Sequence, residues 1–263
     1  MLVPSVAMLA GDLLSALDSR YPFAGAGDWD PVGLQVGGVT RSADRVGVCH
    51  EVTSPVVDSA IDSGIECLVT YHPLIFTPTT SLVDGSTAEG TALKLAEHGI
   101  SLVVVHTALD VAQPGTADAF LHELGLVSAE SFAPVDEYGG GDIGRIGYLN
   151  DPLTFNEVVS KVSAVVGGPV RTSSRHPQLV ESVAVVPGSG GGFAEAAAGL
   201  ADVYISGDIG HHDANQAIAH GVAVIDAGHA PSERPGVRGL YAAVCEMSPT
   251  ATMLGDDPHP WEG

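Results

Sequence analysis

Short apolar runs alternate with helical stretches of about ten residues through the first half of the chain, and this alternation constrains the fold most strongly. Three runs are predicted to be buried strands: 45–49, 67–70 and 102–105. The stretches that follow them are predicted to be helices: 55–63, 91–98 and 116–124. Strands linked by helices of this length predict a mainly parallel sheet that is covered on both faces.

The strand and helix pattern restarts after a change in composition. Residues 128–142 contain Pro134, Asp136 and three consecutive glycines, Gly139 to Gly141, which suits a boundary between lobes. We therefore predict an α/β protein with two lobes of mixed or mainly parallel sheet flanked by helices. The first lobe is predicted to hold residues 1–127 and 229–263, and the second to hold residues 128–228.

The charge of the chain excludes several classes of partner. The chain has 32 acidic against 10 basic residues and a formal charge of −22, which disfavours binding to nucleic acid and to anionic membranes. No apolar run reaches the ~18 residues that a membrane span needs. The three cysteines are scattered without a Cys-x-x-Cys motif, which indicates a reducing, cytoplasmic environment.

Four predicted strands end in histidines and carboxylates. The segments are Tyr71-His72, His106 to Asp110, Asp208 to Asp213, and Asp226 to Glu233. Ligands of open parallel sheets bind beyond the carboxyl ends of the strands. Imidazoles bind divalent metals there, and a carboxylate can bridge two ions that hold a water nucleophile. These strand ends predict a metal-dependent hydrolase site.

The order of the motifs resembles one family. The segments are Trp29 to Gly37, Tyr71 to Phe76, His106 to Asp110, Ser206 to Asp213, and Asp226 to Glu233. They are similar to the hallmarks of the NGG-interacting-factor-three-like family, often named GTP cyclohydrolase I type 2 homologs. The resemblance implies a two-lobed α/β protein, two divalent metals in a cleft between the lobes, and a toroidal homohexamer.

The resemblance also implies particular metal ligands. His72, Asp110, His229 and Glu233 fall on the family's ligand positions, with Glu233 as the bridge. The family has two consecutive histidines where this chain has Tyr71 and His72, and a phenol with a pKa of ~10 is a poor ligand for Zn²⁺ or Mn²⁺. A hydrogen-bonding role is favoured for Tyr71. The chain then holds one or two ions of Zn, Mn or Fe, and the second ion is weak, absent, or completed by His106 or water.

Two further histidines match family positions. His106 and His212 are predicted to contact the substrate, and the alternative for His106 is to support Asp110 as a hydrogen-bond donor. His211 is expected to be solvated. Asp226 is expected to have a structural role.

Two functions remain open at this point. The first is a hydrolase acting on a small nucleotide-like or phosphorylated molecule, in which Glu233 or Asp110 accepts the proton. GTP ring opening is what the family name implies. The second is a metal-binding scaffold, regulatory protein or metal chaperone without catalysis, which the loss of a ligand at Tyr71 favours.

Overall fold

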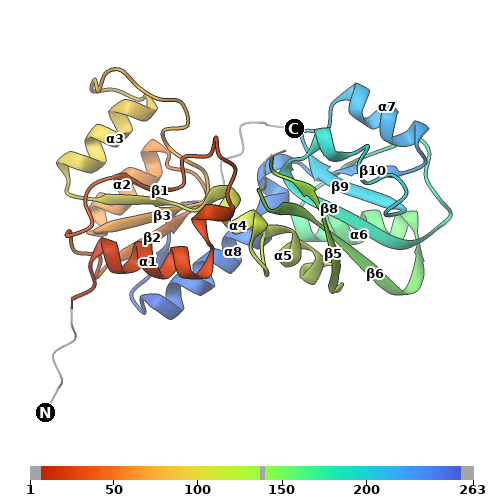
Figure 1. Ribbon diagram of the computed structural model, residues 1–263, viewed down its shortest axis with the longest axis horizontal. Helices are drawn as coiled ribbons and strands as arrows, with labels where there is room; N and C mark the ends of the chain where they lie inside the picture. The colour runs from red at the N-terminus through yellow and green to blue at the C-terminus, as the bar shows by residue number, and fades with distance from the viewer. Residues whose placement is uncertain (1–6, 137–139, 256–263) are drawn as a thin grey trace, which may run out of the picture. The chain divides into compact units, whose positions relative to one another are not determined.

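The chain forms two compact units, and each is built around one β-sheet with helices on both faces (Figure 1). The computed structural model describes residues 7–136 and 140–255. Unit 1 comprises the described residues up to Ala112 and those from Val237 onward, and unit 2 runs from Gln113 to Gly236. The predicted α/β architecture of two helix-flanked sheets is confirmed.

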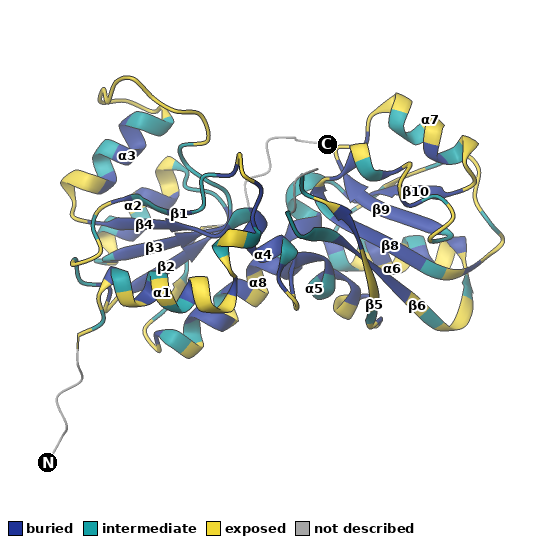
Figure 2. Ribbon diagram, viewed as in Figure 1, coloured by how far each residue is buried: buried dark blue, intermediate teal, exposed yellow. Residues whose placement is uncertain are grey.

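The sheet of unit 1 has five strands in the order β1-β4-β3-β2-β11. Their bounds are β1 (Gly33–Val36), β2 (Val46–Cys49), β3 (Cys67–Thr70), β4 (Ser101–Val104) and β11 (Thr252–Met253). All neighbours are parallel except β1, which pairs antiparallel with β4. Every residue of the three central strands is buried, which explains why their sequences are mostly apolar instead of alternating (Figure 2).

Helices cover both faces of this sheet because successive strand residues point to opposite sides. On one face Val46, Val48 and Val69 pack with α1 (Ala10–Arg20), α4 (His106–Val111) and the later turns of α8 (His229–Met247). On the other face Leu68, Leu102 and Val104 pack with α2 (Ser54–Asp62) and α3 (Ala88–Glu97). A short 3₁₀ turn, η1 (Phe23–Gly25), follows α1.

The sheet of unit 2 is mixed and has six strands in the order β5-β6-β8-β9-β10-β7. Their bounds are β5 (Ser128–Pro134), β6 (Asp142–Thr154), β7 (Arg171–Thr172), β8 (Leu179–Ser189), β9 (Val203–Gly207) and β10 (Ala223–Asp226). The pairs β8-β9 and β9-β10 are parallel, and the other three pairs are antiparallel.

Two helices cover one face of this second sheet. Val183, Val185 and Ile205 pack there against α5 (Thr116–Glu123) and α6 (Phe155–Val166). The opposite face carries α7 (His211–Ala219) and the segment after the 3₁₀ turn η2 (Gly191–Phe193).

The boundaries between the two units differ from the lobe boundaries predicted from the sequence. The predicted boundaries lie between residues 127 and 128 and between residues 228 and 229. Phe120 and Leu121 of α5 belong to the core of unit 2, so the first boundary lies before that helix, at Ala112 and Gln113. The second boundary lies inside α8, at Gly236 and Val237. The first turns of α8, with His229 and Glu233, therefore belong to unit 2.

No helix within the described ranges has the length and apolar character that crossing a bilayer requires.

Candidate metal centre

The carboxyl ends of β2, β3 and β4 place three histidines side by side in unit 1. His50 follows β2, His72 follows β3, and His106 begins α4 directly after β4 and Val105. The amide of His72 donates to the carbonyl of His50 at 2.9 Å, and the amide of His106 donates to the carbonyl of Tyr71 at 3.0 Å. The ring centroids lie 4.7 Å apart for His50 and His72 and 5.6 Å apart for His72 and His106. The parallel pairing of the strands thus produces a row of imidazoles.

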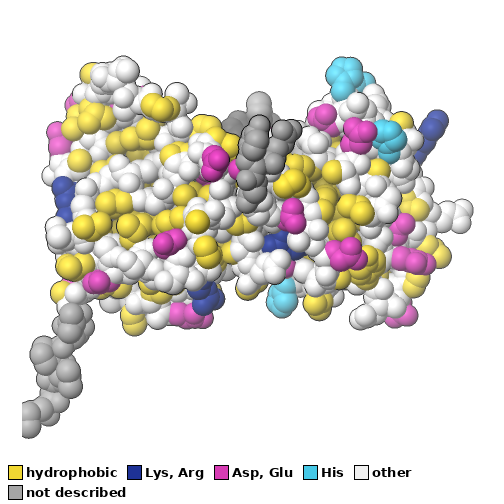
Figure 3. Space-filling view, viewed as in Figure 1, with side chains coloured by type: hydrophobic (Ala, Val, Ile, Leu, Met, Phe, Trp, Pro, Cys, Tyr) yellow, Lys and Arg dark blue, Asp and Glu magenta, His cyan; other side chains and the backbone are white. Residues whose placement is uncertain are grey.

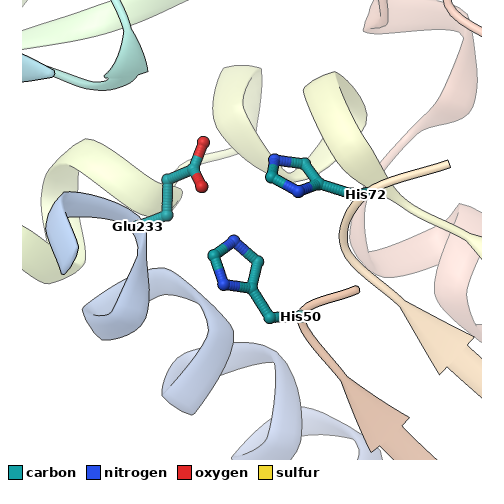
Figure 4. A group of neighbouring side chains, drawn as sticks. All are labelled: His50, His72 and Glu233. Atoms are coloured by element: carbon teal, nitrogen blue, oxygen red, sulfur yellow. The ribbon is translucent and has the colours of Figure 1, made fainter. Parts of the chain in front are cut away.

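His50, His72 and Glu233 form a group of potential metal ligands (Figure 4). One ligand atom from each residue lies within 4.8 Å of those of the other two, and the three side chains converge. His50 and Glu233 are buried, with Glu233 only 3% exposed. Two neutral imidazoles and one carboxylate suit a borderline divalent metal such as Zn, Mn or Fe, so the donor set fits the metal that the sequence predicts.

In three histidines, Nδ1 of the imidazole lies within hydrogen-bonding distance of a carboxylate oxygen. The pairs are His72 with Glu51 at 3.1 Å, His106 with Asp30 at 2.9 Å, and His229 with Asp208 at 2.6 Å. An ionised carboxylate only accepts hydrogen bonds, so each Nδ1 carries the proton. The neutral form of each ring then has its lone pair on Nε2, which is the arrangement that metal-binding histidines adopt.

His229 and Glu233 face each other at the start of α8. Nε2 of His229 lies 3.1 Å from Oε1 of Glu233, four residues along the same helix. With Nδ1 donating to Asp208, Nε2 of a neutral ring would present a lone pair to the carboxylate. Two electron-rich atoms at this distance repel each other unless a proton or a metal ion lies between them. The pair can hold a proton or a metal ion between these two atoms.

The start of α8 is held against the end of β8. The hydroxyl of Ser232, which is fully buried, accepts from the amide of Gly188 at 2.8 Å and donates to the carbonyl of His229 at 2.7 Å. Gly188 has a φ of 73°, and a Cβ atom there would overlap Oε1 of Glu233. The absence of a side chain at Gly188 leaves room for the Glu233 carboxylate.

Tyr71 makes a hydrogen bond with one of the predicted ligands. Its buried hydroxyl donates to Oδ1 of Asp110 at 2.8 Å. The hydrogen-bonding role favoured for Tyr71 from the sequence is confirmed by this contact. One oxygen of Asp110 is thereby engaged by a phenol, where the family pattern has a second imidazole at the position of Tyr71.

Asp30 anchors His106. Its buried carboxylate accepts from the amide and the hydroxyl of Thr107 as well as from Nδ1 of His106. His106 has a φ of 28°, in the left-handed region that side-chain-bearing residues rarely adopt. The hydrogen bonds of Asp30 hold the backbone in this conformation and engage Nδ1 of His106.

The buried thiol next to the histidine row carries no charge at neutral pH. Cys49 ends β2 immediately before His50, and burial raises the pKa of its thiol to about 12.

The remaining predicted residues lie in unit 2. His212 is exposed in the first turn of α7, and His211 beside it contacts the amide nitrogen of Asn215 at 2.9 Å. Asp226 pairs with Arg171 and accepts from the amide of Ile209, in accordance with a structural role. The metal-binding role of His72, Asp110, His229 and Glu233 and the substrate role of His106 and His212 stay predictions.

The sequence interpretation missed His50. The sequence does contain a signal for His50, because this residue directly follows a predicted strand. The four segments with histidines and carboxylates follow predicted strands in the same way.

Comparison with known proteins identifies the family. Residues 8–254 match the family model described as Duf34/NIF3 (NGG1p interacting factor 3). The chain is 32% identical to a GTP cyclohydrolase 1 type 2 homolog from Streptomyces coelicolor, over 95% of this chain and 88% of the relative. It is 30% identical to a GTP cyclohydrolase 1 type 2 homolog from Streptococcus pneumoniae, over 84% of this chain and 85% of the relative.

The fold is shared with a solved structure as well. The crystal structure of Staphylococcus aureus hypothetical protein SA1388 superposes with a TM-score of 0.89 at 26% identity, over 98% of this chain and 100% of that one. The match of the family model over nearly the whole described chain, together with these relatives, shows that the protein belongs to the Duf34/NIF3 family.

Proposed function

We propose that the protein is a metal-dependent hydrolase that acts on a small nucleotide-like or phosphorylated molecule. The observation that carries this proposal is the convergence of His50, His72 and Glu233, the last of which also faces Nε2 of His229. We propose that His72, Asp110, His229 and Glu233 bind one or two divalent ions, with His50 as an additional ligand. The name of the Streptomyces coelicolor relative, GTP cyclohydrolase 1 type 2 homolog, supports a nucleotide-like substrate.

The residues of the site suit the steps of a hydrolysis. A bound divalent ion supplies a water of lowered pKa and polarises the bond to be cleaved. Glu233 is buried beside His229 and is positioned to accept the proton of that water, and Asp110 is the other candidate. His106, held by Asp30, and His212 are proposed to contact the substrate.

Elemental analysis of the purified, untagged protein tests the proposal. We expect one to two metal atoms per chain. Glu233→Gln, which keeps the shape and removes the charge, should lower both the metal content and any activity found in a screen of hydrolysable metabolites. Glu246→Gln is the matched control, because Glu246 lies exposed on the same helix and pairs with Arg20. A metal content near zero after incubation with Zn, Mn and Fe would refute the proposal.

The second candidate is a metal-binding scaffold or metal chaperone without catalysis. The hydrogen bond from Tyr71 to Asp110 favours it. Tyr71 stands where the family has a second histidine, and an imidazole at that position would be free to bind the second ion of a two-metal hydrolase. Tyr71→His should then raise the metal content by about one ion per chain. A protein that loses its oligomeric state on chelation and hydrolyses no metabolite would support this second candidate over the first.

The partners proposed for the chain follow from the family and from its charge. We propose that it assembles with itself as a toroidal homohexamer and binds a small-molecule substrate, with neither nucleic acid nor membrane as a partner. All three cysteines have free thiols, which supports a cytoplasmic location.

A further inference from the structure

Two large aromatic side chains of unit 1 are exposed next to the histidine row. Trp29 is 52% exposed and Phe76 is 54% exposed. Their ring centroids lie 5.9 Å apart with an angle of 56° between the planes. Most other aromatic residues of the described chain are buried, among them Tyr21, Tyr71, Phe120, Phe155 and Tyr204. Tyr148 of unit 2 is exposed as well, but its hydroxyl donates to Glu130, whereas Trp29 and Phe76 present two exposed rings that contact each other.

Both rings border His106. The ring of His106 lies 6.2 Å from that of Trp29 and 6.5 Å from that of Phe76, each in an edge-on arrangement. On its other side His106 lies 5.6 Å from His72, which belongs to the candidate metal group. A molecule that covers Trp29 and Phe76 is thus next to the proposed reaction centre.

The loops that carry the two rings are tied together. Gln35 on β1 makes two hydrogen bonds with the backbone of Ile75, as acceptor from its amide at 3.0 Å and as donor to its carbonyl at 2.9 Å. The same side-chain amide donates to the carbonyl of Pro31 at 3.1 Å. Asp30, directly after Trp29, is buried and fixed by Thr107. Trp29 and Phe76 therefore lie on braced segments, which lowers the entropy that these loops lose when a ligand binds.

We propose that Trp29 and Phe76 form a subsite that binds the planar heteroaromatic ring of the substrate. Exposed aromatic faces stack on flat heterocycles, and such stacking tolerates many bases because each presents a π-face. The proposal names the substrate class of the proposed hydrolase and rests on that function. The ring would lie over the two aromatic side chains, and the bond to be cleaved would extend past His106 toward His72.

The fluorescence of Trp29 tests this subsite directly. The chain has two tryptophans, Trp29 and Trp261, so the Trp261→Phe variant reports on Trp29 alone. In this variant, stripped of metal by a chelator, adenosine should quench the emission in a saturable way, and ribose 5-phosphate should not. Excitation at the red edge of tryptophan absorption avoids absorption by the nucleoside.

Substitutions of Phe76 separate stacking from general apolar contact. In the Trp261→Phe background, Phe76→Leu should weaken adenosine binding roughly tenfold or more, and Phe76→Tyr should restore it. Leu82→Ala is the matched control, because Leu82 is equally exposed in the same unit, and it should leave binding unchanged.

Two results would overturn the subsite. One is the absence of saturable quenching by adenosine, guanosine, cytidine and nicotinamide alike. The other is quenching that depends on protein concentration instead of nucleoside concentration, which would show that a second copy of the chain covers the two rings. Metal analysis of the same variant before chelation separates the two proposals, because metal bound at that stage without later nucleoside binding refutes only the subsite. Nucleoside binding by a variant that held no metal before chelation and takes up none on incubation with Zn, Mn and Fe refutes only the metal-dependent function.

Discussion

At the scale of single residues, the carboxylates that contact Nδ1 of the histidines leave Nε2 as the nitrogen that can bind a metal. Asp208 illustrates this role, because its oxygen accepts a hydrogen bond from Nδ1 of His229 and leaves Nε2 facing Glu233. Asp208 has a φ of 51°, in the left-handed region that aspartate and asparagine tolerate better than most residues. Its backbone conformation and its contact with His229 indicate a positioning residue.

Replacing Asp208 should weaken metal binding without unfolding the protein. We expect Asp208→Asn, which keeps a residue suited to the positive φ, to reduce the metal affinity by about 10–100-fold. The affinity is measured by titration of metal-free protein with Zn²⁺. Glu195→Gln is the matched control, because Glu195 pairs with Nδ1 of His220 outside the group of predicted ligands and should leave the affinity unchanged. Equal affinities for Asp208→Asn and the native protein would show that Asp208 does not position His229.

Within the group of His50, His72 and Glu233, the sequence predicted His72 and Glu233, which lie in motifs that follow strands, whereas His50 has no motif around it. Asp110 and His229 were predicted as ligands in the same way and stay predictions. The pairing of each imidazole with a carboxylate was beyond prediction, because Glu51 and His72 meet only when β2 and β3 pair in register. Contacts between distant residues depend on the sheet register, which one sequence does not display.

At the scale of elements, the buried strands were the most predictable part of the fold. β3 was predicted at its observed bounds, and β2 and β4 within one residue, because all their residues are buried and nearly all are apolar. β6 has less of this signal, since it continues to Thr154 past an irregularity in its pairing with β8. Most residues of that last part are exposed, so its sequence resembles a loop.

The end of β8 controls the position of Glu233, and a substitution at Gly188 tests this. A Cβ atom at Gly188 would collide with the flexible end of the Glu233 side chain and not with backbone atoms. Gly188→Ala should therefore displace the carboxylate and lower the metal content while the protein stays folded. Gly167→Ala is the matched control, because Gly167 has the same φ of 73° at the end of α6 but faces open space. Both variants should cost about 1 kcal/mol of backbone strain. Full metal content in Gly188→Ala would contradict this role for Gly188.

The start of α6 should give the stability of unit 2 a dependence on pH. The hydroxyl and amide of Thr154 both donate to Glu157, and these hydrogen bonds lower the pKa of the Glu157 carboxyl. A lowered pKa in the folded state means that the contribution to stability is present above the unfolded pKa of ~4.3 and is lost as the pH falls through the folded pKa. Glu157→Gln should therefore destabilise the protein at neutral pH and have little effect in acid. Urea midpoints of both proteins across this range check the prediction, and a difference that persists in acid would contradict it.

At the scale of the whole molecule, the excess of acidic residues dominates the surface. The face drawn in Figure 3 carries scattered acidic side chains and few basic ones. Several of the basic residues are themselves paired with carboxylates, as Lys94 is with Asp58 and Arg145 is with Asp118. Positive charge is therefore neutralised locally, which supports the proposal that nucleic acid is not a partner.

The same charge makes the proposed homohexamer sensitive to salt. Six chains, each with a formal charge of −22, repel one another unless salt screens the repulsion, and the screening length falls from ~30 Å at 0.01 M salt to ~8 Å at 0.15 M. We therefore expect sedimentation equilibrium to give the hexamer mass at physiological salt and smaller species at low salt. Adding Zn²⁺ at low salt should restore part of the hexamer if bound metal offsets acidic charge, and Mg²⁺, which imidazoles bind weakly, should not do so at equal ionic strength. A monomer at every salt concentration would refute the proposed assembly, and a hexamer that salt dissociates would show that attraction between charged groups holds the chains together.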